Sequence, residues 1–174
     1  ALSFLFEELA FSQDIQSQLV AEINDHLGDR TPSQEDLEHM PFLAQVIETN
    51  LQRNPSVYMS ARDVMINTQM TDTEGNHYHF EKGSLILISP YLIQRDLRNW
   101  PHDGFDPTLF EDSIKKGQLP SDSCDDFRIA TFFGGNHRCV GRFFARQEMK
   151  LILIELLRHV HLTPLGPRSQ KEMA

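Results

Sequence analysis

The pattern of apolar positions predicts helices over most of the first third of the chain. Segments 1–11, 13–27 and 41–53 repeat apolar side chains at the spacing of one helix face. In the second segment the repeating residues are Ile15, Leu19, Ile23 and Leu27. Between the last two segments, Ser33 and Asp36 have the spacing of a capping box, which predicts the start of a short acidic helix.

The middle of the chain has a shorter period and predicts strands. Strand-like runs cover residues 57–59, 64–66, 77–80 and 85–88, and we expect a short helix over 90–98. The unbroken Leu-Ile-Leu-Ile run at 85–88 predicts a buried strand. Pro, Gly, Asp and Ser dominate residues 99–126, so we expect a long irregular stretch there. Helices outweigh strands, which predicts a mainly α, or α+β, fold.

Composition limits the class of protein. The 174 residues suit one domain, and a net charge of −9 argues against a nucleic-acid partner. We see no signal peptide and no apolar run of about 18 residues, so we expect a cytoplasmic protein, with a membrane anchor upstream of Ala1 left open. The chain begins inside a predicted helix and without Met, so we expect it to be the C-terminal part of a longer protein.

One of the two cysteines stands in a setting that favours metal binding. Cys124 and Cys139 form no disulfide framework and no zinc-ligand spacing. Cys139 follows a glycine-rich loop and opens an apolar-periodic helix that runs to Arg158. Glycines allow close approach to a flat group, and the start of a helix favours the thiolate, the form that binds metal. A buried cysteine at an ordinary loop-to-helix junction is the alternative.

Four positions around this cysteine have a fixed spacing. Phe132, Gly135, Cys139 and Gly141 make the pattern Phe-x-x-Gly-x-x-x-Cys-x-Gly. The pattern resembles the haem-binding loop of the cytochrome P450 family, the haem-thiolate monooxygenases. The resemblance implies that these residues bind haem b (iron protoporphyrin IX), with the Cys139 thiolate as the metal ligand and Phe132 beside it.

Three cations complete the cofactor site that the resemblance implies. Haem propionates need cationic or hydrogen-bonding partners. Arg62 follows the strand-like segment 57–61, where the family places a propionate arginine. His137 stands where the family usually has Arg, and we include Arg138, beside the cysteine, among the cofactor-binding residues. A surface salt bridge is the alternative for each cation.

The family's buried charge network is incomplete in this sequence. Glu48 resembles the acidic member of the Glu-x-x-Arg helix motif, but Leu51, or Gln52 in a shifted alignment, replaces its arginine. A buried, unpaired Glu48 would cost several kcal/mol or take up a proton. We therefore expect either that Arg95 or Arg98 supplies the charge, or that Glu48 is exposed.

Two more positions depart from the family pattern. Gln94 replaces the usual His of a His-Arg-Asp segment, and Leu109 stands where a later segment of the family has the third charge of the network, an arginine.

The helix after the cysteine has a basic and an apolar side. Arg142, Arg146 and Lys150 follow one another at four-residue spacing. The resemblance implies that this face binds an electron donor, a ferredoxin or a flavoprotein reductase; a solvated helix face is the alternative. We expect the opposite side to be buried. Its residues are Val140, Phe143, Phe144, Leu151 and Ile154.

Four histidines form two i, i+2 pairs in strand-like segments. They are His77, His79, His159 and His161, and we interpret them as polar surface positions because no third metal ligand has suitable spacing.

The resemblance covers nearly the whole chain, residues 1–174, as the C-terminal haem-binding part of the family's domain without its distal helix. It implies a monooxygenase that oxidises an apolar small molecule with dioxygen, with residues 57–61 and 162–165 on the substrate side. No catalytic residue is assigned. Two alternatives stay open: an atypical enzyme that uses peroxide or rearranges its substrate, and a non-catalytic remnant that binds haem or another protein.

Overall fold

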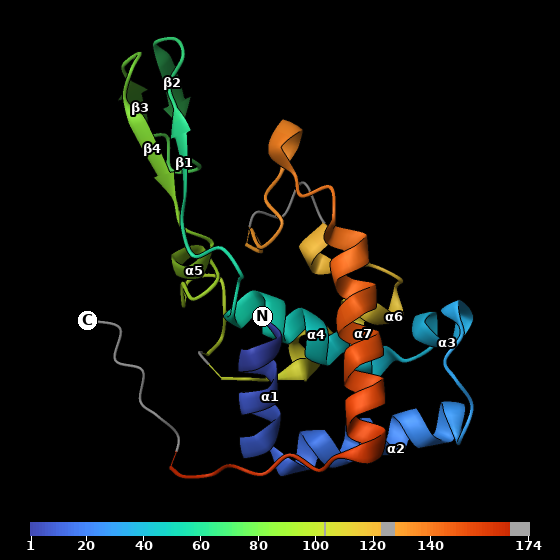
Figure 1. Cartoon of the computed structure of the whole chain (residues 1–174). Helices are drawn as coiled ribbons and strands as arrows, with labels where there is room; N and C mark the ends of the chain where they lie inside the picture. The colour runs from blue at the N-terminus through green and yellow to red at the C-terminus, as the bar shows by residue number, and fades with distance from the viewer. Residues whose placement is uncertain (103, 123–127, 168–174) are drawn as a thin grey trace.

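Four helices form the body of the molecule in this computed structural model, which describes residues 1–102, 104–122 and 128–167 (Figure 1). They are α1 (Leu2–Phe11), α2 (Gln13–Leu27), α4 (Pro41–Arg53) and α7 (Arg142–His159). The bounds of α1, α2 and α4 agree, within one residue, with the helices predicted from the apolar period. The facing sides of the four helices form the main core, whose fully buried side chains are Leu5, Leu9, Leu19, Leu43, Val46, Leu153 and Ile154.

Helix α4 lies at the centre of the body. It contacts α1, α2 and α7, and on its other side it contacts η1 (Pro107–Phe110), α6 (Glu111–Lys115) and η2 (Pro120–Asp122). Every α4 residue from 43 to 52 is buried, polar side chains included. A polar group buried in this way needs a hydrogen-bond partner, so the sequence of α4 constrains the segments around it.

The short helix α3 (Gln34–Glu38) begins with the predicted capping box. The Ser33 hydroxyl accepts the Asp36 backbone N–H, and the Asp36 carboxylate accepts the Ser33 backbone N–H. Hydrogen bonds from Arg30 and Ser33 hold the pKa of Asp36 well below its usual value. Its contribution to stability is therefore present above the ordinary aspartate pKa and is lost as the pH falls through the lower, folded-state value.

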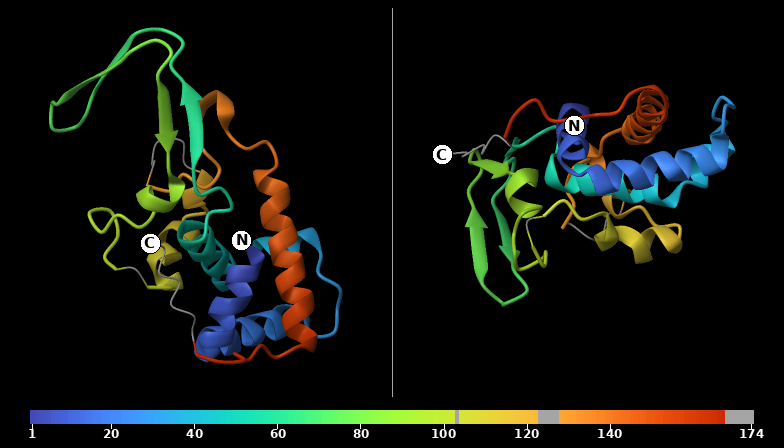
Figure 2. Two further views of the ribbon diagram at one scale, coloured as in Figure 1. Left: turned by 60° about the vertical axis from the view of Figure 1, so that its left-hand side comes forward. Right: turned by 90° about the horizontal axis from the view of Figure 1, so that it is seen from below.

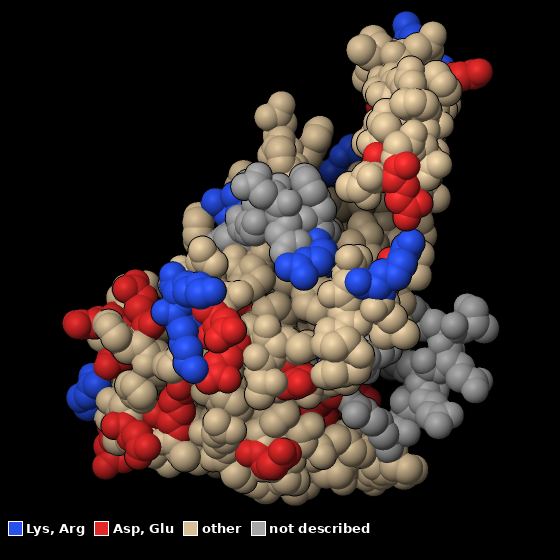
Figure 3. Space-filling view, turned by 180° about the vertical axis from the view of Figure 1, so that it is seen from behind, with Lys and Arg blue, Asp and Glu red and all other residues tan. Residues whose placement is uncertain are grey.

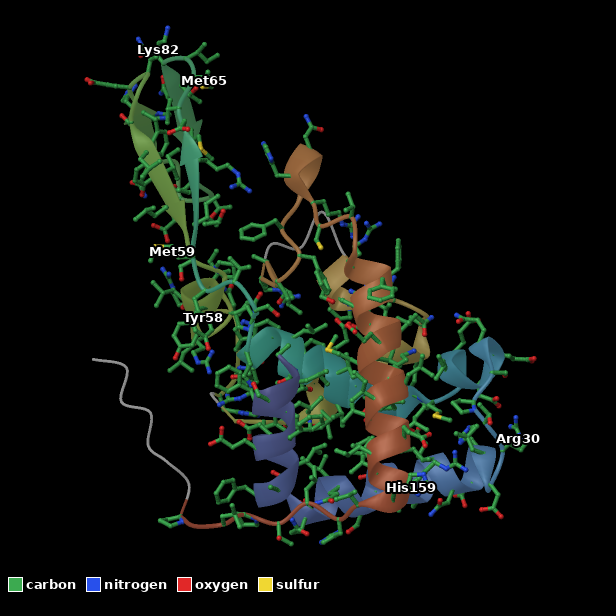
Figure 4. The ribbon with its side chains drawn as sticks, in the orientation of Figure 1. Arg30, Tyr58, Met59, Met65, Lys82 and His159 are labelled. Carbon is green, nitrogen blue, oxygen red and sulfur yellow. The ribbon has the colours of Figure 1, made fainter. Side chains whose placement is uncertain are left out.

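The strands form an arm that stands away from the helical body (Figure 1; Figure 2, left). Two antiparallel pairs make up this arm, β1 (Ser60–Asp63) with β4 (Leu85–Ile88) and β2 (Thr68–Thr71) with β3 (His77–Phe80). Tyr58 and Met59 lie at its base, and Met65 and Lys82 at its tip (Figure 4). Much of the arm is uncharged when seen from behind (Figure 3).

Strand positions and burial differ in part from the sequence predictions. The predictions for 77–80 and 85–88 are correct, but 57–59 and 64–66 are not strands. The prediction that 85–88 is buried is wrong, because Leu85 and Leu87 are 59% exposed. The β1–β4 pair has only two strands, so each residue faces one neighbouring strand and much of both faces stays open.

Short helical turns interrupt the long segment that was predicted to be irregular. The expected helix over 90–98 is only one turn long, α5 (Pro90–Ile93), and the described residues between 99 and 126 contain η1, α6 and η2. After α7 the described tail has no helix or strand. None of the described helices is long and apolar enough to cross a membrane.

The capping box gives a test of the fold. We expect Ser33→Ala to lower the free energy of unfolding by about 1 kcal/mol, because the first turn of α3 loses an acceptor for a backbone N–H. Urea denaturation measures this loss. Ser17→Ala, inside α2, is the matched control and should change stability by less than about 0.5 kcal/mol; equal losses in the two variants would contradict the assignment.

Candidate functional site

The cysteine loop, residues 130–141, lies at the end of α7 that is on the arm's side of the body (Figure 1). Backbone hydrogen bonds close it on itself. The Cys139 N–H donates to the Phe132 carbonyl at 2.9 Å, and the Phe133 N–H donates to the Ala130 carbonyl at 3.0 Å. Between them Gly135–His137 form the short turn η3. The loop therefore holds its shape through its own main chain.

Two residues of the loop have left-handed backbone. Phe133 has φ 53° and Gly135 has φ 59°. Glycine adopts this conformation at little cost, whereas a residue with Cβ is strained there. Gly141 has an ordinary φ of −87°, so its backbone does not require glycine. A Cβ added at Gly135 or Gly141 would meet open space.

Cys139 lies at the end of the loop with an exposed side chain that is in no disulfide. The following helix begins three residues later, at Arg142, and not at the cysteine as the sequence pattern indicated. The Arg142 guanidinium turns back and donates to the Cys139 carbonyl at 3.3 Å. The exposed thiol contradicts the alternative of a buried core cysteine. Cys124 lies outside the described residues.

A cavity of about 190 Å³ opens beside the loop. Its lining combines apolar side chains with two cationic or polar ones: Arg62, Ile88, Ile93, Ile129, Ala130, Phe133, Gly134 and His137. Arg62 comes from β1 and stands 5.5 Å from the Phe133 ring centroid. The structure thus brings Arg62 and His137 to one cavity, although 75 positions separate them in the sequence.

The other predicted cofactor residues belong to the same loop but do not line this cavity. Cys139, Arg138 and Gly141 do not line it, and Gly135 lies in η3. Phe132 is buried at 8% exposure and points into the main core.

These groups fit the haem that the sequence resemblance implies. An exposed thiol supplies a soft ligand for iron. The glycines leave open space in front of the loop, and the cavity has an apolar wall with Arg62 and His137 suited to anionic propionates. The cavity suits one edge of such a flat group.

Glu48 is the functional residue whose surroundings the sequence did not reveal. It is 1% exposed, so the expectation of an exposed Glu48 is wrong. Its carboxylate accepts hydrogen bonds from the backbone N–H and the hydroxyl of Ser121, both at 3.0 Å. It also forms an ion pair with Arg146, whose Nε lies 3.1 Å from Oε1.

The two arginines proposed as partners of Glu48 are engaged elsewhere. Arg95 donates to the Arg53 carbonyl and stacks on Tyr91. Arg98 is 87% exposed and pairs with Asp96. The expectation that one of them supplies the charge is therefore wrong.

The predicted basic stripe on α7 is not a continuous exposed face. Arg146 is only 4% exposed. Lys150 is half-buried, donates to the Leu37 carbonyl, and has a pKa lowered chiefly by burial. Two of the three cations thus face the body, so the prediction that Arg142, Arg146 and Lys150 together bind an electron donor is wrong.

The buried side of α7 differs from the predicted one as well. Of the predicted residues only Ile154 is buried, while Val140, Phe143, Phe144 and Leu151 are exposed. The buried stripe consists of Arg146, Met149, Leu153, Ile154 and Leu157. The prediction failed because α7 has apolar residues on two sides, roughly a third of a turn apart. The spacing of apolar residues alone does not show which of these sides faces the core.

Gln94, at the position of the family's histidine, is fully buried and joins α4 to the cysteine loop. Its amide donates to the Leu51 carbonyl at 3.0 Å, and its Oε1 accepts the Ala130 N–H at 2.7 Å. The Thr131 hydroxyl bonds to the same oxygen and to the Leu51 carbonyl. A neutral side chain thus fixes the start of the loop.

All four histidines of the i, i+2 pairs are exposed. His159 lies at the end of α7 far from the cysteine loop (Figure 4). No group of three or more His, Cys, Asp and Glu side chains in the described part of the chain could hold a metal ion.

The backbone of Gly135 gives a test of the loop. We expect Gly135→Ala to lower the free energy of unfolding by roughly 1–2 kcal/mol, because alanine is strained at this φ although its Cβ has room. Thermal and urea denaturation measure the loss. Gly166→Ala is the control, since a Cβ there also meets open space and φ is not left-handed; the assignment fails if both variants lose the same stability.

Comparison with known proteins agrees with this geometry. The chain is 28% identical to cytochrome P450 4d8 of Drosophila melanogaster over 98% of its length, and 32% identical to human cytochrome P450 4V2 over 91%. It is 32% identical to human cytochrome P450 3A5 over 94%. These matches span 36%, 29% and 30% of the relatives, so the chain covers about a third of their length. The cytochrome P450 family model matches residues 1–173. The chain belongs to the cytochrome P450 family.

Proposed function

We propose that residues 1–174 are the C-terminal haem-binding part of a cytochrome P450 monooxygenase and that the Cys139 thiolate is its iron ligand. The observation that carries the proposal is the position of Cys139. The loop with the Phe-x-x-Gly-x-x-x-Cys-x-Gly spacing folds on its own hydrogen bonds and leaves this thiol exposed, and other residues of the same loop line a cavity together with Arg62.

Each remaining residue has a distinct part in holding the cofactor. Arg62 and His137 bind the propionates of haem b, because both reach the cavity from different segments. Phe132 packs behind the cysteine, and Gly135 and Gly141 keep the front of the loop open. Arg138 contributes positive charge beside the ligand. The bound haem supplies the iron chemistry by which one oxygen atom of dioxygen enters the substrate.

The substrate is an apolar small molecule, and exposed apolar side chains in the segments that the resemblance puts on the substrate side, 57–61 and 162–165, support this. Val57 and Met59, before β1, are 45% and 57% exposed, and Leu165 in the tail is exposed too. Electrons come from a ferredoxin or a flavoprotein reductase. Arg146 and Lys150 are not part of its docking surface, because both side chains face the body of the protein.

The monooxygenase is favoured over the atypical enzyme by the surroundings of Glu48. An enzyme that uses peroxide or rearranges its substrate was considered because the sequence lacks the two arginines of the family's charge network around Glu48. Arg146 supplies a cation to that network, so the departure in sequence leaves no unpaired carboxylate.

The iron ligand can be tested by spectroscopy. In the full-length protein, carbon monoxide added to the reduced form should produce a thiolate-type Soret band, and Cys139→Ser should abolish it, because a hydroxyl is not a thiolate. Absorption difference spectra measure this. Cys124→Ser is the matched control and should keep the band. A protein that takes up no hemin, or a band that survives Cys139→Ser, would rule out the proposal.

The cationic lining can be tested by titration with hemin. We expect Arg62→Ala to weaken hemin binding by roughly tenfold, the loss of one charge-assisted hydrogen bond of about 1.5 kcal/mol. Arg98→Ala, which removes an exposed arginine paired with Asp96, should leave the affinity unchanged. Equal affinity of wild type and Arg62→Ala would remove Arg62 from the site.

A further inference from the structure

The pair Glu48–Arg146 joins two features of this sequence, a position without an arginine on α4 and a buried arginine on α7. Position 51 holds Leu where a Glu-x-x-Arg motif would have its arginine, and position 146 holds Arg on the core face of α7. The other members of that stripe are apolar: Met149, Leu153, Ile154 and Leu157. A missing cation on one helix thus meets a buried cation on another.

Both partners are buried, so each charge needs the other for the folded protein to be stable. Their side chains are 1% and 5% exposed. An ionised group in such a place is stable only when it is paired and hydrogen-bonded, and removal of one partner leaves a buried charge. Ser121 supplies a hydrogen bond to each of the two charged groups: its hydroxyl donates to the Glu48 carboxylate and accepts from the Arg146 guanidinium.

Arg146 also touches the cysteine loop. Its guanidinium carbon stands 4.9 Å from the centroid of the Phe132 ring, within the range of a cation–π contact. The Phe132 carbonyl accepts the Cys139 N–H. A continuous set of contacts therefore runs from Glu48 on α4 through Arg146 and Phe132 to the backbone of Cys139.

We propose that Arg146 takes the place of the missing arginine as the cation paired with Glu48, and that it is the positioning residue of the cysteine. It neutralises Glu48 from a helix 98 positions further along the chain, and it fixes the orientation of the cysteine loop against α4. The effect on the loop reaches the thiolate through Phe132, without contact between Arg146 and the reacting atoms. The effect on the iron ligand rests on the function proposed above; the coupling to Glu48 does not.

A double-mutant cycle tests the coupling in the full-length protein. Glu48→Gln and Arg146→Met should each lower the folding equilibrium constant by about 100-fold or more, because each removes one charge of a buried ion pair and keeps the other. The double variant should lose at least about tenfold less than the product of the two single losses. Urea denaturation gives all four constants. Independent, multiplicative losses would overturn the proposal.

A second readout separates positioning from simple stability. The carbon monoxide spectrum of Arg146→Met should shift from the thiolate-type band toward that of a neutral thiol. Arg146→Lys, which keeps a cation near Phe132, should recover part of the thiolate band, whereas the double variant, which lacks it, should not. Arg158→Met, on the same helix, is the control and should keep the full band. A thiolate band unchanged in folded Arg146→Met would overturn the positioning role.

The outcomes also distinguish this inference from the proposed function. If wild type gives no thiolate band but the cycle shows coupling, the haem function fails and the charge replacement stands. If wild type gives the band and Cys139→Ser abolishes it, but the cycle shows no coupling, the function stands and the role of Arg146 fails. Should Arg146→Met not fold at all, a cycle of Glu48→Gln with Arg146→Lys still measures the pair.

Discussion

The structure depends on a carboxylate that lies at the centre of its main core. Helix α4 is buried along most of its length and contacts nearly every other part of the body, so Glu48 cannot reach water. A charge in this position must be neutralised by a cation from a neighbouring segment. Arg146 provides that cation and thereby ties α4 to the helix that follows the cysteine. The requirement for charge balance in the core thus also determines where the cysteine loop lies.

The helices of the body could be predicted from sequence because their signals are local. The apolar period and the capping box at Ser33 act within one or two turns of chain. The strand predictions at 57–59 and 64–66 failed by a few residues because the arm is a pair of two-stranded ribbons. Burial selects neither face of such ribbons, so the apolar pattern does not determine where they begin and end.

In the candidate site too, the features with local sequence signals could be predicted and those that depend on packing could not. The spacing around Cys139 is local and identified the loop, its glycines and the family. The partner of Glu48 could not be found, because the two residues come together only when α7 packs on α4. One signal was present: Arg146 shares a helix stripe with Met149 and Leu153, where a charge is out of place unless a buried partner faces it. The basic spacing with Arg142 and Lys150 suggested a surface role instead.

The burial of Arg146 also changes the electrostatics of the cysteine side. A cation paired with a carboxylate inside the protein has little field at the surface, since the two charges cancel over a short distance and its contribution to steering is lost. The chain has a net charge of −9. Because Arg146 is paired inside the protein and Lys150 is partly buried, the surface of α7 near the cysteine is less basic than the sequence indicated. Docking of the proposed electron donor would then depend on other cations or on apolar contact. The arginine that holds the core together is therefore one that partner recognition cannot use.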